Sequence, residues 1–337
     1  MTALMPPPGG FDLRIAVTGA GGFIGGALVS HLLAGDGHSG LHRVSELVAV
    51  DARLPAFGDE RVVAAEGDLL ESGFRDAVFD RPFDVVFHLA AVPGGAAARD
   101  PVLGWAVNVD AGIAILAALA RQKQAARLVL ASSVAVFGVP LPRDRVDDDT
   151  LPLPSMSYGA HKLICETALA DFARRGLVDG IAPRLPGIIA RPPVKGGHIS
   201  AYMSDVLHAI AAGEAYECPV APQATAWFMS RSRCVENLAA AAALPRGMAM
   251  PRRAFNLPAL HLSMAELIAG AGTHFGADAT RRVSFAPNPE IEAQFGSYPP
   301  LLTPVADALG LRHDGDATAL VARALELSDV TTQGSAA

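Results

Sequence analysis

Five short apolar segments, each followed by a loop or a helical stretch, restrict this chain to few architectures. They cover residues 14–18, 46–50, 61–65, 84–88 and 127–131. Their apolar residues are consecutive and do not alternate with polar ones, which is typical of strands buried on both faces of a parallel sheet. Helical patterns over residues 23–34 and 101–121 provide crossovers between such strands. The order predicts an α/β fold with a doubly wound parallel sheet.

The second part of the chain is less regular. From about residue 184, proline and glycine interrupt the alternation, although a capping box, Ser263-Met-Ala-Glu266, predicts a further helix, and residues 316–327 predict another. We expect residues 1–13 to be a flexible leader, 14–184 the parallel-sheet domain and 185–330 mainly a smaller mixed domain. Segments near 225–260 are expected to return to the first domain, and residues 331–337 to fray.

Charge and cysteine content narrow the range of partners. Lys and Arg number 27 against 34 Asp and Glu, which gives a formal net charge of −7. An acidic chain without a long basic run argues against binding to nucleic acid or to an anionic membrane. We recognise no run of about 18 uncharged apolar residues, so no membrane span is expected. The three cysteines are scattered, which favours a cytoplasmic protein without disulfides or a metal site.

A glycine-rich turn, Thr18-Gly-Ala-Gly-Gly-Phe-Ile-Gly25, joins the first strand to the first helix. Gly19, Gly22 and Gly25 are spaced so that backbone N–H groups can approach a pyrophosphate at the positive end of the helix. An ordinary glycine turn is the alternative. Asp51 ends the second strand, where a carboxylate accepts hydrogen bonds from ribose hydroxyls and repels a 2′-phosphate, which favours NAD over NADP.

Two residues near this predicted nucleotide site bear on which nucleotide it binds and how. Arg53 follows Asp51 closely and opposes the preference for NAD, because an arginine can bind a 2′-phosphate. Asp68, in Gly67-Asp-Leu69, follows the third strand and is expected either to bind the adenine amino group or to cap a helix. These two roles do not exclude each other.

Tyr158 and Lys162, in Tyr-Gly-Ala-His-Lys, are four residues apart and share one face of a predicted helix. An ammonium group in that position stabilises the phenolate, so Tyr158 can accept a hydroxyl proton. This spacing alone is common. Ser132 and Ser133 follow the fifth strand, and ligands of parallel sheets bind beyond the carboxyl ends of the strands. A serine there can hold a substrate oxygen, with a plain turn as the alternative.

Two polar residues in apolar surroundings have structural interpretations. His88 ends the fourth strand and is expected to be a buried, hydrogen-bonded histidine rather than a catalyst. Asn108 lies inside a helical pattern, where an amide is unusual. We expect it to satisfy backbone groups behind the site, with a solvent-facing side chain as the alternative.

These motifs together resemble the extended short-chain dehydrogenase/reductase family, also called the NAD-dependent epimerase/dehydratase group. The resemblance covers about residues 14–327 and rests on TGAGGFIG, Asp51, GDL, HLAA, Asn108, SSVAVFG, YGAHK and RLPGIIARP. It implies a Rossmann sheet, a smaller substrate domain, NAD as cofactor, and hydride transfer between a substrate carbon and nicotinamide C4. It assigns catalytic positions to Ser133, Tyr158 and Lys162. It also implies cofactor contacts from Phe23, Ile24, Leu69, Leu89, Ala90, Ala91, Asn108, Tyr158, Lys162 and Pro186, with Lys162 on the nicotinamide ribose.

Within this family, residues 155–162, 174–180 and 184–192 are most similar to dehydrogenases of short sugar acids. The similarity implies oxidation of the C2 hydroxyl of an aldonate to a 2-keto acid. Arginine is the favoured partner of a carboxylate. Arg231 and Arg233 are therefore candidate substrate ligands ahead of a helix predicted over 234–244, with surface solvation as the alternative. Ser132, Ser133 and Tyr158 complete this predicted substrate set.

Some features keep other functions open. Gly187 stands where a threonine is expected, which bears on the substrate, and Lys195 and His198 are taken as surface residues. A uronate dehydrogenase or a nucleotide-sugar epimerase or dehydratase is the alternative, although an aromatic content of 6% leaves few rings to stack a base. A non-catalytic NAD sensor is disfavoured because the serine, tyrosine and lysine are all present. The helices near 101–121 and Tyr158 are candidates for a homodimer interface.

Overall fold

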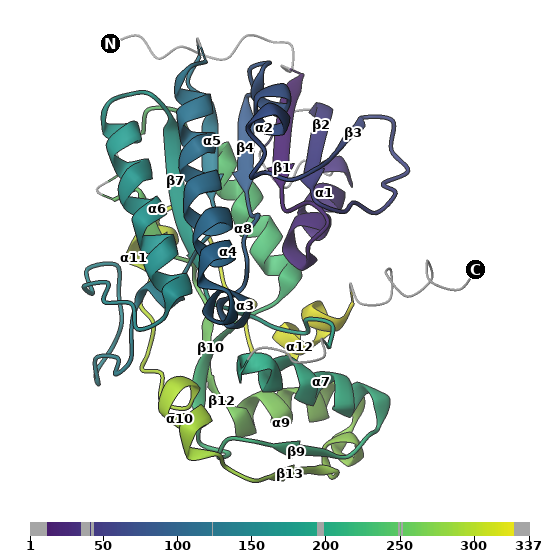
Figure 1. Ribbon diagram of the computed structural model, residues 1–337. Coiled ribbons are helices and arrows are strands. Elements are labelled where there is room, and N and C mark those ends of the chain that lie inside the picture. Colours follow the sequence, from purple (N-terminus) through teal and green to yellow (C-terminus); the bar gives the residue numbers. More distant parts are fainter. Residues whose placement is uncertain are drawn as a thin grey trace.

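The computed structural model describes residues 12–34, 41, 44–122, 124–193, 199–248, 250 and 252–326. Two lobes are visible, a larger one built on a long sheet and a smaller one below it (Figure 1). Most of the predicted leader, the frayed tail, Lys195 and His198 lie outside the described residues. Leu13, expected in the leader, is instead the first residue of a strand.

The larger sheet is parallel throughout, with strand order β11-β7-β5-β4-β1-β2-β3, and a short β6 pairs with β7. The strands are β1 (Leu13–Thr18), β2 (Val44–Asp51), β3 (Val62–Glu66), β4 (Val85–His88), β5 (Arg127–Leu130), β6 (Ser132–Ser133), β7 (Asp179–Leu185) and β11 (Ala254–Asn256). Consecutive β1 residues such as Ile15, Ala16 and Val17 are fully buried, because helices cover both faces. The predicted doubly wound fold is confirmed.

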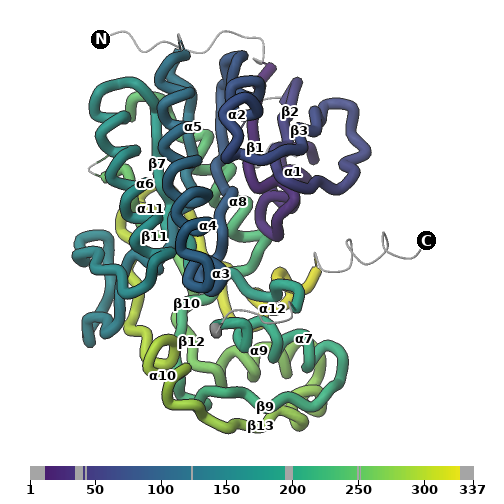
Figure 2. Tube along the Cα trace, in the orientation of Figure 1, coloured from purple at the N-terminus to yellow at the C-terminus, as the bar shows by residue number. Residues whose placement is uncertain are grey.

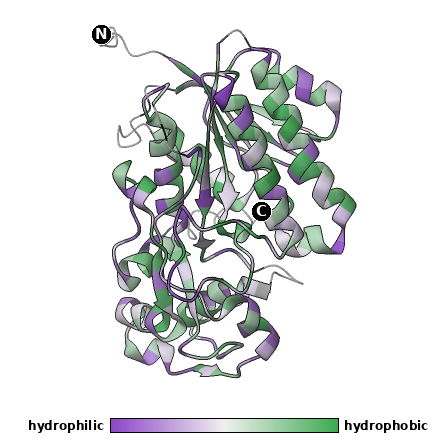
Figure 3. Ribbon diagram, turned by 90° about the vertical axis from the view of Figure 1, so that its left-hand side faces the viewer, coloured by the Kyte–Doolittle hydropathy of each residue, from purple (hydrophilic) through white to green (hydrophobic). Residues whose placement is uncertain are grey.

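Each face of this sheet has its own helical layer. Helices α1 (Phe23–Ala34) and α8 (Arg231–Ala243) pack on one face, where Leu28 and Leu238 are fully buried. Helices α2 (Ser72–Phe79), α5 (Ala111–Ala120) and α6 (Ser157–Arg174) cover the other. The sequence analysis missed α2, which buries only Val78 and Phe79. Figure 3 shows that the helices beside the sheet mix apolar and polar positions.

The stretch predicted as one helix over 101–121 is interrupted. It consists of α4 (Pro101–Trp105), a π-helical turn (Ala106–Asp110) and α5. The helical stretch Pro101–Ala120 is long and apolar enough, by length and composition, to cross a membrane, although Asp110 lies in its middle and no uncharged run of that length occurs in it. Half of that stretch is buried inside the protein, and α5 packs on the sheet. This is the position of a core helix.

The smaller lobe contains a three-stranded sheet and a two-stranded one. Strands β8 (Gly187–Ile188), β10 (Thr225–Met229) and β12 (Leu260–Ser263) form the first, and β9 (Tyr216–Cys218) and β13 (Val283–Phe285) the second. Helices α7 (Tyr202–Ala212), α9 (Met264–Phe275), α10 (Pro289–Phe295) and α12 (Ala317–Leu325) surround them. The predicted capping box is confirmed at the start of α9, where Ser263 and Glu266 bond to each other's backbone N–H groups.

The chain passes between the lobes repeatedly, as the trace in Figure 2 shows. It leaves the larger lobe after β7, returns as α8 and β11, and returns again as α11 (Pro304–Ala308), whose Ala306 is buried in the larger core. Helix α3 (Gly94–Arg99) follows β4 and lies where the two lobes meet. The carboxyl ends of the parallel strands therefore face the smaller lobe.

Candidate active site

The glycine turn brings three parts of the backbone into close approach. Gly19 has a φ of +76°, and a Cβ atom there would lie 2.7 Å from the backbone nitrogen of Ala90. A Cβ atom at Gly25 would lie 1.9 Å from the carbonyl oxygen of Gly19. Only glycine fits at these positions, so β1, the start of α1 and the end of β4 pack closely around the turn. A helix N-terminus that follows a glycine turn suits the binding of a pyrophosphate.

Asp51 lies directly against this turn. One carboxylate oxygen accepts a hydrogen bond from the backbone N–H of Gly21 at 3.0 Å, and the other accepts one from Ala52 at 2.7 Å. The side chain is therefore fixed beyond the end of β2 and beside the glycine turn. This is the relationship that a ribose-binding carboxylate requires.

The remaining predicted cofactor residues lie along the same edge of the sheet. Asp68 accepts a hydrogen bond from the backbone N–H of Leu70 at 2.8 Å in the turn after β3. It is not the N-cap of α2, since Glu71 occupies that position. The others follow the carboxyl ends of β1, β3, β4 and β7; they are Gly22, Phe23, Ile24, Leu69, Leu89, Ala91 and Pro186.

Tyr158 and Lys162 lie in the first turns of α6 with their side chains together. The Lys162 ammonium nitrogen is 5.5 Å from the centre of the Tyr158 ring and donates a hydrogen bond to the Ala131 carbonyl oxygen at 2.7 Å. Lys162 is buried, whereas Tyr158 remains partly exposed. The ammonium group is thus fixed between the phenol and the end of β5.

Ser133 is held close to the start of the same helix. Its hydroxyl oxygen accepts a hydrogen bond from Ala135 N–H at 3.1 Å, in a short 3₁₀ turn (Val134–Val136). A Cβ atom at Gly159 would lie 1.9 Å from the Ala135 carbonyl oxygen, so this turn contacts α6 beside Tyr158. Ser133 stays partly exposed. The segment that carries Ser133 therefore packs against the start of the helix that carries Tyr158 and Lys162.

Asn108 is a buried residue of the π-helical turn. Its amide oxygen accepts a hydrogen bond from Val92 N–H at 2.7 Å, and its amide nitrogen donates to the Val92 carbonyl at 2.9 Å and lies 3.3 Å from His161 Nδ1. The expectation that Asn108 satisfies backbone groups is confirmed. The loop that it holds leads to Gly94, where a Cβ atom would contact the Tyr158 side chain.

Comparison with known proteins decides the family. The model of the "NAD dependent epimerase/dehydratase family" matches residues 15–229. The chain belongs to the NAD-dependent epimerase/dehydratase family. It is 34% identical to a D-erythronate dehydrogenase of Cupriavidus necator over 85% of this chain and 90% of that one. It is 30% identical to the D-erythronate dehydrogenase of Haemophilus influenzae over 90% of this chain and 96% of that one.

Solved structures show the same relationship. A nucleoside-diphosphate-sugar epimerase from Agrobacterium tumefaciens superposes with a TM-score of 0.86 at 28% identity, covering 96% of this chain and 97% of that one. An L-threonine dehydrogenase from Clostridium difficile has a TM-score of 0.80 at 21% identity, over 95% and 99%, which supports the fold. Proteins named as a dehydrogenase and as an epimerase thus share this scaffold.

In this family member, Ser132 does not face the site. Adjacent strand residues point to opposite faces, so Ser133 and Ser132 diverge. Ser132 is buried and its hydroxyl lies 2.5 Å from Glu166 Oε1, while Arg184 binds both Glu166 oxygens at 2.9 and 2.8 Å. The prediction that Ser132 binds substrate is corrected: its hydroxyl belongs to a buried polar cluster behind β6.

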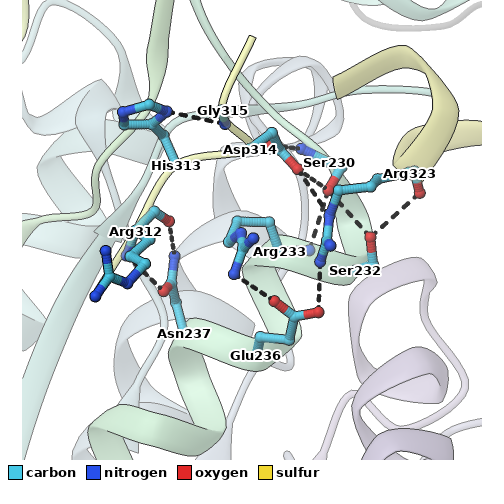
Figure 4. Close-up of polar contacts among 10 residues, drawn as sticks. All are labelled: Ser230, Ser232, Arg233, Glu236, Asn237, Arg312, His313, Asp314, Gly315 and Arg323. Atoms are coloured by element: carbon cyan, nitrogen blue, oxygen red, sulfur yellow. Dashed lines mark hydrogen bonds and ion pairs between the residues drawn. The ribbon is translucent and has the colours of Figure 1, made fainter. Parts of the chain in front are cut away.

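The two predicted substrate arginines also lie in positions that differ from the prediction. Both lie in the first turn of α8, not ahead of it, because Ser230 caps that helix. Arg233 is paired with Glu236 at 2.6 Å, and Glu236 also pairs with Arg323, which bonds Asp314 (Figure 4). Figure 4 shows Arg233 turned toward Glu236 within this cluster. We therefore correct the assignment of Arg233: its charge is already paired within the protein.

Arg231 is buried with its guanidinium carbon 4.6 Å from the centre of the Phe23 ring. Because Phe23 begins α1, Arg231 lies at the glycine turn. His88, in contrast, is remote from solvent, and its Nδ1 lies 2.7 Å from Thr18 Oγ1. Burial, with a contribution from Lys162, lowers the pKa of His88 to about 3, so its ring is neutral. This agrees with the structural role expected for it.

One arginine near the site was missed. Arg191 follows β8, and its backbone carbonyl is bonded by His208 at 2.8 Å. Burial lowers the pKa of Arg191, whereas the Tyr158 phenol and the Cys234 thiol act in the opposite direction. The sequence signal was available, since Arg191 belongs to the motif RLPGIIARP, but nothing in its spacing relates it to Tyr158.

Proposed function

We propose that this protein is an NAD-dependent dehydrogenase that oxidises the C2 hydroxyl of a short sugar acid, of the D-erythronate type, to a 2-keto acid. The observation that carries the proposal is the Lys162 ammonium held beside the Tyr158 ring, in the helix against whose start the Ser133 segment packs. The 34% and 30% identity to two D-erythronate dehydrogenases over most of each chain supports the substrate class.

The residues fit a dinucleotide. The glycine turn and the N-terminus of α1 suit its pyrophosphate, and Asp51 suits the adenosine ribose. The Asp51 carboxylate would repel a 2′-phosphate, so we propose NAD rather than NADP. We propose that the Lys162 ammonium group binds the nicotinamide ribose. Bound NAD supplies a hydride acceptor for the substrate carbon.

Side chains of the protein accept the hydroxyl proton and stabilise the resulting charge. Tyr158 accepts it from the C2 hydroxyl, and the Lys162 ammonium, held at 5.5 Å from the ring centre, stabilises the phenolate. Ser133 holds the same substrate oxygen and orients the C–H bond. The carbonyl of Ala131 fixes Lys162 in turn. The backbone N–H of Ala135 likewise holds the Ser133 hydroxyl.

A nucleotide-sugar epimerase is the second candidate, favoured by the superposition with the Agrobacterium tumefaciens enzyme. The test is a panel of C4 to C6 aldonates, uronates and nucleotide sugars, each assayed with NAD by nicotinamide absorbance, with nucleotide sugars also assayed for epimer formation. Turnover of aldonates supports the proposal. Turnover of nucleotide sugars alone would refute it.

A further inference from the structure

The side-chain amide of Asn108 has one orientation that satisfies its partners. Its oxygen accepts a hydrogen bond from the Val92 N–H at 2.7 Å, and its nitrogen donates to the Val92 carbonyl oxygen at 2.9 Å. Because a backbone N–H only donates and a carbonyl only accepts, exchanging the amide oxygen and nitrogen would break both bonds. The amide nitrogen has a second hydrogen, and His161 Nδ1 lies 3.3 Å from that nitrogen.

The orientation of Asn108 determines the protonation of His161. The Asn108 nitrogen only donates, so His161 Nδ1 must accept, and the ring hydrogen of neutral His161 then lies on Nε2. A protonated ring carries a hydrogen on both nitrogens, and two N–H groups would face each other across 3.3 Å. The contact between the two side chains therefore exists only while His161 is neutral.

The surroundings of His161 also disfavour a positive charge on its ring. The residue is 5% exposed, and the Trp105 ring packs edge-on against it at a centroid distance of 5.7 Å. Burial, with a contribution from the Lys162 ammonium, lowers the pKa of His161 from its ordinary value of 6.5. The other titratable or charged groups on the elements around it are Cys165, Asp110, Arg99 and His88.

These groups are engaged elsewhere or have the wrong charge. Asp110 accepts the indole hydrogen of Trp105 at 3.0 Å, and Cys165 donates to the Asn108 carbonyl oxygen at 3.1 Å. Arg99 is a second cation, and His88 is neutral. In the part of the chain that the structure describes, His161 makes no ion pair with a carboxylate. A proton on its ring would thus be both uncompensated and opposed by Asn108.

The loop after β4 contacts the same face of α6 at a second point. Tyr158 and His161 are three residues apart and share that face. A Cβ atom at Gly94 would lie 3.6 Å from Tyr158 Cβ, so the Gly94 backbone packs against Tyr158. Val92, two residues earlier, is held to His161 through Asn108. The loop of residues 92–94 is therefore fixed along α6 at both positions.

We infer that neutral His161 is a positioning residue: through Asn108 it holds the loop of residues 92–94 against Tyr158, and its protonation releases that loop and slows turnover in acid. The loop follows the carboxyl end of β4, where ligands of parallel sheets bind, so its position bears on the reaction. The kinetic test of this inference rests on the proposed function, whereas the structural test does not.

Kinetics in the reductive direction, from the 2-keto acid and NADH, separate His161 from Tyr158. In that direction Tyr158 donates the proton, so acid favours its working form and a loss of kcat below pH 6.5 comes from another group. We expect the kcat of the wild type to fall by about threefold or more from pH 7 to pH 5. His161→Asn keeps an acceptor near the Nδ1 position and does not titrate. It should stay within about threefold of the wild type at pH 7 and lose most of the acid decline.

Two further variants complete the kinetic comparison. His161→Leu removes the acceptor and should lower kcat by about tenfold at pH 7, because the loop is misplaced. Cys165→Ala alters a contact with the Asn108 backbone but leaves its amide in place, so this control should keep the wild-type pH profile. An equal acid decline in His161→Asn, or a His161→Leu enzyme with wild-type kcat, overturns the inference.

Nitrogen-15 NMR of the labelled protein tests the same inference without turnover. At pH 7.5 His161 should carry its hydrogen on Nε2, and on acidification the amide signals of Val92 and Gly94 should shift with the midpoint of His161. A hydrogen on Nδ1, or amide signals that do not follow this midpoint, overturns the inference. Turnover of nucleotide sugars alone would refute the proposed function and leave the outcome of this NMR test unchanged.

Discussion

The hydroxyl of Ser132 lies 2.5 Å from Glu166 Oε1, which ties the strand that carries Ser133 to the helix that carries Tyr158 and Lys162. Arg184 on β7 completes the cluster by binding both Glu166 oxygens, and all three side chains are buried. A buried ion pair holds its two side chains in place, but both charges lose their contact with water. Removing one partner therefore leaves the other charge buried without compensation. The cluster thus makes the position of the catalytic groups and the stability of the lobe depend on the same contacts.

Glu166→Ala should therefore destabilise the protein strongly. We expect the free energy of unfolding to fall by about 3–5 kcal/mol, because Arg184 remains buried without its carboxylate. Urea unfolding followed by circular dichroism measures this. The matched control is Asp171→Ala on the same helix, whose ion pair with Arg174 is exposed and worth ~0.5 kcal/mol or less. Equal effects for the two variants would contradict the interpretation.

Tyr158→Phe should remove the proton acceptor and keep the ring. We expect kcat to fall by about 1,000-fold, within the range for loss of a general base. The affinity for NAD, measured by titration, should stay unchanged. Tyr216→Phe on β9 is the control and should retain normal turnover. A Tyr158→Phe enzyme with most of its kcat would show that another group accepts the proton.

Asp51→Asn should change the choice of nucleotide. Removing the negative charge beside the Gly21 N–H removes the repulsion of a 2′-phosphate, and we expect the ratio of kcat/KM for NADP over NAD to rise by about tenfold or more. Steady-state assays with both nucleotides give the ratio. Glu60→Gln, an exposed residue in the loop before β3, is the control. A wild type that uses NADP as well as NAD would already refute the role of Asp51.

His88 should make stability depend on pH. Its ordinary pKa of 6.5 falls to about 3 in the folded protein, so below pH 6.5 the unfolded chain binds a proton that the folded one does not. The contribution of His88 is therefore complete above pH 6.5 and declines by about 1.4 kcal/mol per pH unit down to its folded pKa.

Urea unfolding of the wild type and His88→Gln at several pH values tests this. As the pH falls below 6.5, the unfolding free energy of the wild type should decrease more than that of His88→Gln. His274→Gln, which alters an exposed histidine on α9, should show no such trend. A difference that is constant from pH 7.5 to 4.5 would exclude the assigned role of His88.

An exposed apolar surface on α4 and α6 is the basis for a prediction about assembly. Val102 is 81% exposed, and Leu103, Trp105 and Ile164 are also exposed. We propose that this surface pairs two copies in a homodimer, as expected for the helices near 101–121 and Tyr158. Val102→Asp should then yield a monomer in sedimentation, whereas Val63→Asp, 47% exposed on β3, should not. A monomeric wild type would refute the proposal.

The features that the sequence predicted correctly are those that depend on residues close to one another in the chain. The apolar strands, the glycine turn and the capping box at Ser263 depend on neighbouring residues, and each appears in the structure. The approach of Tyr158 to Lys162 follows from helical spacing alone. Asn108 was anticipated because an amide inside an apolar helix needs polar partners, which Val92 supplies.

Contacts between segments that are far apart in the chain could not be predicted from the sequence pattern. Ser132 and Ser133 are equivalent in sequence, and only the partner at Glu166 decides which one faces the site. Arg233 was a plausible anion ligand until Glu236 and Arg323 were seen around it.

Because β11 comes late in the sequence, the nucleotide-binding lobe cannot be isolated by ending the chain after β7. Residues 254–256 cover the outer edge of β7, and α8 fills the face behind β1. A fragment that stops at residue 184 would expose both an unpaired strand edge and a wide apolar surface, the combination that promotes aggregation. During synthesis, too, the ribosome must pass Asn256 before this lobe can close. Isolating the lobe would therefore require grafting residues 231–256 onto it, not simple truncation.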